Sequence, residues 1–196
     1  MDNSTLSAYD RNAKAFADDW ESQPMPSDLQ AIVREYFTGG PTADIGCGSG
    51  RDAAWLNAHG YPTQGFDASE SLLIEARKRH PSINFVSATL PDLDVIADCS
   101  FTNVFCETVI MHLDASEITR GVERLLAILA PGGTLYLSWR VTKDHDGRDK
   151  FGRLYAAVRP QQVLDALSTA QILYDDQTES VSSAKLVRRI VARKSR

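Results

Sequence analysis

One stretch of this sequence reads Ala43-Asp44-Ile45-Gly46-Cys47-Gly48-Ser49-Gly50, a short apolar run that leads into alternating glycines. Glycine has no side chain, so it adopts backbone angles closed to other residues and lets a ligand come close to the main chain. The apolar run predicts a strand over Thr42–Ile45, and the residues after the glycines predict a helix over Arg51–His59. The stretch is therefore typical of the turn that joins a strand to a helix in an α/β unit.

An acidic residue further along the chain relates this turn to ligand binding. The next expected strand ends at Gly65-Phe66-Asp67, about 20 residues beyond the first glycine, where a carboxylate accepts hydrogen bonds from both hydroxyls of a ribose. A glycine-rich turn alone is weak evidence, because many tight turns look like it. Together with Asp67 it favours a nucleoside site.

The rest of the chain repeats the alternation of short apolar runs and helices that indicates a mostly parallel sheet. The last run alternates apolar and charged residues, as an antiparallel, half-exposed strand does. We therefore expect an α/β fold, a Rossmann-like three-layer sandwich with a seven-stranded, mostly parallel sheet whose last strand is antiparallel. The expected strands are Thr42–Ile45, Pro62–Phe66, Ile83–Val86, Phe101–Cys106, Thr134–Trp139, Ala170–Asp176 and Lys185–Ala192.

Length and helical patterns predict the domain organisation. A chain of 196 residues, 43% of them hydrophobic, is expected to form one domain with a sizeable core. Within it we expect lid or cap helices over residues 1–40, starting with an amphipathic helix over Ser4–Asp19, and a nucleotide-binding core over residues 41–196. The clearest helix precedes Pro131-Gly132-Gly133, and its apolar stripe is expected to be core: Ile118, Val122, Leu125, Leu126 and Leu129.

Charge and cysteine content limit the partners. The net charge of −5 gives no general attraction to nucleic acid, and the basic end of the chain, Arg188–Arg196, fits a half-exposed strand better than an RNA contact. No apolar run approaches the roughly 18 residues of a membrane span, and the polar start lacks a signal-peptide core. The three cysteines lack the paired spacing of a zinc site, so no metal is expected. We therefore expect a soluble cytoplasmic protein with a small-molecule partner.

The residue after the third glycine helps to identify the nucleoside. A dinucleotide fingerprint would have glycine at position 51, where this chain has Arg51. With its acidic residue followed by G-x-G-x-G, the stretch instead resembles the first motif of the class I S-adenosylmethionine-dependent methyltransferases. The resemblance covers nearly the whole chain and continues through Asp67, Leu90-Pro91, the segment Cys106–Asp114 and residues 130–135. It implies S-adenosylmethionine as the cofactor and methyl transfer as the activity.

The resemblance also implies which residues hold the cofactor. The glycine turn would lie along its methionine part, Asp67 would bind the ribose, and residues after the second and third strands would border the adenine. Arg51 would reach the carboxylate of the cofactor, or would pair with Asp52 or Asp44. The family often has an aspartate after the third strand, and this chain has none there. The implied contacts come from Asp44, Gly46, Cys47, Gly48, Arg51, Asp67, Ala68, Ala88, Thr89, Leu90 and Cys106.

The segment after the fourth strand would face the methyl group. It lacks the Pro-Pro-aromatic motif of enzymes that methylate base amines and the Pro-Cys pair of cytosine methyltransferases, so Cys106 is expected to be a buried small residue rather than a nucleophile. The candidate catalytic residues are Glu107 and His112, which can contact a substrate or take its proton. Each has a structural alternative: Glu107 would bind the amino group of the cofactor, and His112 would cap a short helix.

Acceptor contacts are expected from two segments that would cover the carboxyl ends of the strands. One is the N-terminal region, with Tyr9 and Trp20. The other follows the fifth strand, from Trp139-Arg140 through the charged stretch Lys143–Arg153 to Tyr155, and it would suit a small acceptor with a carboxylate or an aromatic ring. The alternative for the charged stretch is a solvated loop.

Two other functions stay open. A nicotinamide-dependent oxidoreductase has a similar nucleotide-binding unit, but Arg51 and the absence of a Tyr-x-x-x-Lys pair argue against it. A cofactor-binding partner subunit without catalytic activity would retain the same glycines and Asp67, because binding and turnover are separate properties.

Overall fold

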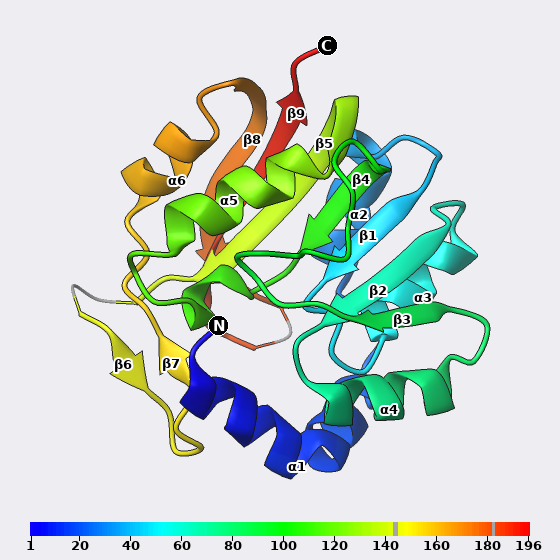
Figure 1. Cartoon of the computed structure of the whole chain (residues 1–196), viewed down its shortest axis with the longest axis vertical. Helices are drawn as coiled ribbons and strands as arrows, with labels where there is room; N and C mark the ends of the chain where they lie inside the picture. The colour runs from blue at the N-terminus through cyan, green and yellow to red at the C-terminus, as the bar shows by residue number, and fades with distance from the viewer. Residues whose placement is uncertain (143–144, 182) are drawn as a thin grey trace.

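The computed structural model describes residues 1–142, 145–181 and 183–196, and a seven-stranded sheet runs through it (Figure 1). The strand order is β3-β2-β1-β4-β5-β9-β8. Every neighbouring pair from β3 to β5 is parallel, while β9 is antiparallel to both β5 and β8. This confirms the expected fold and the reversed last strand. The strands are β1 (Thr42–Ile45), β2 (Thr63–Asp67), β3 (Asn84–Ser87), β4 (Phe101–Cys106), β5 (Leu129–Arg140), β8 (Ala170–Glu179) and β9 (Leu186–Lys194).

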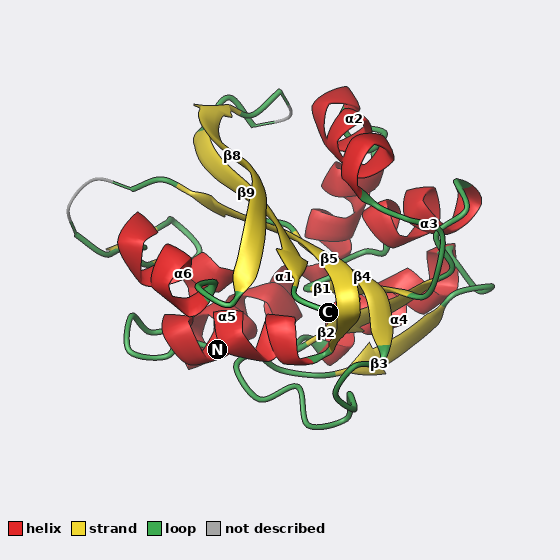
Figure 2. Cartoon of the chain, turned by 90° about the horizontal axis from the view of Figure 1, so that it is seen from above, coloured by secondary structure: helices red, strands yellow, loops and turns green. Residues whose placement is uncertain are grey.

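Helices cover both faces of the sheet (Figure 2). On one face α5 (Ile118–Ala127) and α6 (Pro160–Ala166) pack over β4 and β5, and the expected stripe of α5 is buried from Ile118 to Leu126. Leu129 of that stripe is buried too, but it begins β5 rather than ending the helix. On the other face lie α2 (Ser27–Tyr36), α3 (Arg51–Ala58) and α4 (Glu70–Arg79).

The two N-terminal helices have different positions. Helix α1 (Asn3–Glu21) crosses the carboxyl ends of the strands and packs beside α4 (Figure 1). Helix α2 instead packs on the sheet, where Leu29 and Val33 join the core cluster of Phe105 and Tyr136. The apolar face of α2 therefore belongs to the core, and in residues 1–40 only α1 covers the strand ends.

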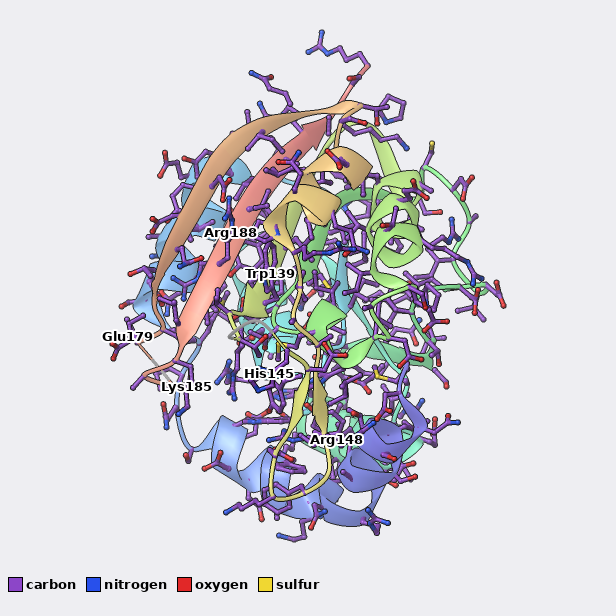
Figure 3. All side chains as sticks on the ribbon, turned by 90° about the vertical axis from the view of Figure 1, so that its left-hand side faces the viewer. Trp139, His145, Arg148, Glu179, Lys185 and Arg188 are labelled. Carbon is purple, nitrogen blue, oxygen red and sulfur yellow. The ribbon has the colours of Figure 1, made fainter. Side chains whose placement is uncertain are left out.

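Two features differ from the expected strands. β5 begins five residues early, at Leu129, and its register against β4 shifts between Phe101 and Asn103, so residues 131–133 form an irregular part of the strand. After β5, two short strands, β6 (Gly147–Arg148) and β7 (Leu154–Tyr155), form a separate two-stranded sheet. This hairpin lies beside α1, where Arg148 pairs with Asp2 (Figure 3).

Trp139 belongs to the core rather than to a surface. Its side chain is 1% exposed and packs in the large cluster under α5 and α6, in the middle of the molecule (Figure 3). Successive residues of a strand point to opposite faces, so Trp139 and Arg140 cannot both face the strand-end cavity. The expected acceptor contact of Trp139 is thus replaced by a packing role.

We predict that Trp139→Ala lowers the free energy of unfolding by about 3–5 kcal/mol, because it removes a large buried ring and leaves a cavity. Urea denaturation measures this loss. Trp55→Ala is the matched control, since Trp55 is half-buried and stacks on exposed His59. Equal losses in the two variants would contradict the core assignment.

Candidate active site

The glycine-rich turn between β1 and α3 is held by hydrogen bonds to the end of β2. The N–H groups of Gly46 and Cys47 both donate to the carbonyl oxygen of Phe66, at 2.7 and 3.0 Å. Gly46 and Gly48 have φ angles of +75° and +55°, and a Cβ at Gly46 would lie 2.3 Å from a methyl group of Val109. These positions therefore require glycine both for the backbone angle and for space.

Asp67 ends β2 and completes this turn. Its carboxylate accepts hydrogen bonds from the N–H of Gly48 at 2.9 Å and from the N–H of Ser69 at 2.8 Å. Burial raises the pKa of Asp67, while these backbone bonds oppose the shift by stabilising the ionised form. The side chain still reaches the cavity described next.

A cavity of about 1080 Å³, open mouth included, lies between the strand ends and α1. Most of the residues proposed from the sequence line it, and the structure brings them together from seven parts of the chain. They are Tyr9, Trp20, Gly46, Cys47, Gly48, Arg51, Asp67, Ala68, Ala88, Leu90, Glu107, His112, Arg140 and Tyr155.

Three residues expected at the cofactor do not line this cavity. Asp44 is buried behind the turn, where it accepts a hydrogen bond from the N–H of Ala53 near the start of α3, and burial raises its pKa well above the ordinary value. Cys106 is fully buried in the core cluster, and Thr89 is exposed on the outer side of the loop after β3. Arg51 reaches the cavity, but its guanidinium pairs with both oxygens of Asp52, one of the two arrangements expected for it.

Glu107 follows β4 and lines the cavity. Its Oε2 accepts hydrogen bonds from Tyr136, at 2.6 Å, and from Ser138. Burial raises its pKa, while these donors and nearby Arg189 oppose the shift. In the part of the chain that the structure describes, Oε1 has no hydrogen-bond partner and is not enclosed. Side chains of β5 thus hold one oxygen of the Glu107 carboxylate, and the other oxygen is left for a ligand.

His112 is buried and hydrogen-bonded through both ring nitrogens. Its Nδ1 donates to the carbonyl of Leu154 at 2.5 Å, and its Nε2 lies 3.0 Å from the hydroxyl of Tyr9. Burial lowers the pKa of His112 to about 4, and burial raises the pKa of Tyr9 to about 12. At neutral pH the ring is therefore uncharged, and Nε2 accepts from the protonated Tyr9 hydroxyl.

Arg153, one of the arginines of the charged stretch after β5, lines the cavity. Its guanidinium donates to the Tyr9 hydroxyl at 3.3 Å, pairs with Asp149 at 2.7 Å, and lies 4.7–5.8 Å from four aromatic ring centroids. Sequence places it inside the charged stretch that also fits a solvated loop, and only the β6–β7 hairpin turns it inward. Lys143 of that stretch lies outside the described residues.

The described ranges contain no cluster of three or more histidine, cysteine or acidic side chains that could hold a metal ion. Nor does any helix within them have the length and apolar character of a membrane span.

Residues 43–133 match a family model described as a methyltransferase domain. Trans-aconitate 2-methyltransferase of Sinorhizobium medicae is 34% identical over 110 residues, which cover 55% of this chain and 41% of that protein. The enzyme of the same name from Acidovorax sp. strain JS42 is 36% identical over 96 residues, 47% of this chain and 35% of that protein. The matches thus span less than half the length of these relatives.

Two solved structures share the fold over nearly the whole chain. The 1,6-didemethyltoxoflavin-N1-methyltransferase of Burkholderia thailandensis, with bound S-adenosylhomocysteine, superposes with a TM-score of 0.77 at 17% identity, covering 98% of this chain and 88% of that one. Magnesium protoporphyrin IX methyltransferase of Synechocystis PCC 6803 gives a TM-score of 0.66 at 18% identity, covering 96% and 81%. At these identities the likeness concerns the fold.

The environment of His112 predicts a loss of stability at acidic pH. In the unfolded chain the imidazole takes up a proton below its ordinary pKa of 6.5, whereas in the native chain it does so only near pH 4. The native state therefore loses stability as the pH falls through this window, by about 3 kcal/mol between pH 7 and pH 4. Urea denaturation at both pH values measures the loss.

His112→Gln is the matched control, because an amide retains hydrogen bonding and does not titrate. We expect its stability to fall by about 3 kcal/mol less than that of the wild type over the same pH range. The same decrease in both proteins would show that His112 is not held neutral.

Proposed function

Because the chain belongs to the class I S-adenosylmethionine-dependent methyltransferase family, we propose that it transfers a methyl group from S-adenosylmethionine to a small-molecule acceptor. The observation that carries the proposal is the single cavity that joins the glycine turn, Asp67 and Glu107 to an enclosed aromatic end. The names of the relatives, which denote methylation of trans-aconitate, 1,6-didemethyltoxoflavin and magnesium protoporphyrin IX, support a small acceptor.

The residues present fit a cofactor with a ribose and two positive charges. Asp67 reaches the cavity from the end of β2, the position expected of a ribose ligand. Glu107 offers the unpartnered Oε1, and a carboxylate there attracts an ammonium or sulfonium group. Gly46 and Gly48 bring the main chain to the cavity wall. These side chains and the turn would hold the cofactor.

The reaction then needs placement more than acid–base chemistry. When bound, the cofactor would supply a methyl group on positively charged sulfur. A lone pair of the acceptor would form a bond to the methyl carbon, and the electrons of the broken carbon–sulfur bond would stay with the sulfur. The protein has to align the acceptor and exclude water. Tyr9 and Trp20 of α1 cover the cavity for this purpose.

No protein nucleophile is needed, and the nearby thiols are unsuited to be one. Cys47 and Cys106 are buried, and burial raises the pKa of both well above the ordinary value. His112, with its pKa of about 4, is a weak base at neutral pH. At neutral pH this ring does not keep a proton released by an acceptor, so that proton passes to the solvent, and an acceptor that is already ionised releases none.

Titration calorimetry with S-adenosylhomocysteine, beside NADH as the competing ligand, tests the proposal. We expect the first ligand to bind, and transfer from methyl-labelled S-adenosylmethionine to a member of a pool of thiols, phenols, amines and carboxylates. Binding of NADH alone would favour the oxidoreductase. Cofactor binding without any methylated product would favour the partner subunit.

We predict that Asp67→Ala weakens S-adenosylhomocysteine binding by about 1.5–3 kcal/mol for each ribose hydrogen bond lost, or at least roughly tenfold. Asp94→Ala, an exposed aspartate outside the cavity, is the control and should bind as the wild type does. Because Asp67 also holds Gly48, thermal denaturation without ligand has to confirm that the variant is folded. Unchanged affinity in a folded variant would remove the ribose assignment.

A further inference from the structure

Arg140 differs from the other arginines of the cavity in having no carboxylate partner. Three arginines line the cavity, and Arg51 and Arg153 pair with Asp52 and Asp149 at 2.8 and 2.7 Å. Arg140 forms no salt bridge within the described residues, and its Nε–H is enclosed without an acceptor. Its one hydrogen bond through the guanidinium is a long one, 3.4 Å from Nη1 to the hydroxyl of Tyr155.

This arrangement leaves a partly buried positive charge uncompensated. Placing a charge in a protein interior costs free energy unless an opposite charge or a full set of hydrogen bonds compensates it. The ring of Tyr155, whose centroid is 5.5 Å from the guanidinium, offsets a small part of that cost. An anion that enters the cavity would offset most of the rest, so the site favours binding of a negatively charged group.

Neutral side chains lie next to Arg140 at this end of the cavity. His112 is neutral, Tyr9 keeps its proton, and Met111, whose sulfur accepts a hydrogen bond from the N–H of Arg140, is apolar. Arg153 carries a charge, but Asp149 neutralises it and four rings hold it in place. One unpaired guanidinium thus faces an otherwise neutral, largely aromatic enclosure.

Strand register separates Arg140 from the acidic part of the cavity. Cys106 pairs with Leu137, so Ser138 lies beside Glu107, to which it donates a hydrogen bond. Arg140 is two residues further along β5 on the same face, roughly 7 Å beyond Ser138. The cavity therefore divides into an acidic part, with Asp67 and Glu107, and a basic end at Arg140.

We propose that the methyl acceptor carries a carboxylate and that the guanidinium of Arg140 binds it. A planar guanidinium matches a carboxylate through two parallel hydrogen bonds. A single unpaired charge suits one carboxylate better than a phosphate dianion, and the rings and Met111 suit the organic body that bears it. The inference rests on the proposed function, and it concerns how the acceptor is bound, whichever atom is methylated.

The experiment measures binding of small carboxylates by calorimetry, with and without S-adenosylhomocysteine. The probes are short aliphatic dicarboxylates and aryl carboxylates, the amide of each as a neutral match, and inorganic phosphate as the other oxyanion. The proteins are the wild type, Arg140→Met and Arg159→Met. Arg159 is an exposed arginine outside this cavity, so its variant removes the same charge elsewhere.

We expect at least one carboxylate to bind the wild type at least tenfold more tightly than its amide and than phosphate. Arg140→Met should lose that preference while S-adenosylhomocysteine affinity and melting temperature stay near the wild-type values, and Arg159→Met should behave as the wild type. Equal carboxylate binding by Arg140→Met, equal binding of the amides or of phosphate, or no carboxylate binding at all would overturn the inference. Failure of S-adenosylhomocysteine to bind would count against the proposed function alone, because the titrations without it still compare the variants.

Discussion

The hydrogen bonds from Gly48 and Ser69 to the carboxylate of Asp67 fix the geometry on which the cavity depends. They tie the turn after β1 to the end of β2, next to the two bonds that the same turn makes to Phe66. A buried carboxylate needs such donors, because it would otherwise lose the hydration of its charge. The backbone supplies them only while the turn keeps its left-handed glycine angles. The charge of Asp67, the conformation of the glycine turn and the position of the end of β2 therefore depend on one another.

A second buried network connects the cavity to helix α2, which packs on one face of the sheet. Glu107 is held by Tyr136 and Ser138 of β5, and Arg189 lies beside them because β9 pairs Arg189 with Ser138. Arg189 in turn pairs with Asp28 of α2 at 2.8 Å. The antiparallel placement of β9 thus brings a cation close to the carboxylate, and that cation limits the rise in the pKa of Glu107. The position of α2 on the sheet, rather than over the cavity, completes this chain of charges.

Helix α1, which covers the cavity, is attached in a different way from helix α5, which covers one face of the sheet. Helix α5 packs through Ile118, Val122 and the leucines, whereas α1 buries only Thr5 and three alanines. Small side chains bury little apolar area, so they contribute less stability than large ones. Polar contacts at the rim hold α1 instead, among them Asp2 with Arg148, Asp10 with Ser69, and Glu21 with Ser49 and His80. The enclosure of the acceptor end thus depends on surface charges and on the ring contacts of Tyr9.

Sequence patterns predicted the parts of the molecule that repeat a local rule. The glycine turn, Asp67, the seven strands with their antiparallel last strand and the stripe of α5 each follow from periodicity or from a motif with a fixed spacing. The errors arose where a side chain's direction depends on tertiary structure. Trp139 and Arg140 both leave a strand end, but the alternation of β5 sends only one of them into the cavity. Strand alternation alone excludes one of the pair, but the choice between them required knowing which face of the sheet carries α5 and α6.

The position of Arg153 depends on a hairpin of two-residue strands that no periodicity marks, and Asp149 neutralises its charge. Arg140 enters the cavity because its neighbour Trp139 is buried in the core, and among the described residues it is the cavity arginine that forms no salt bridge.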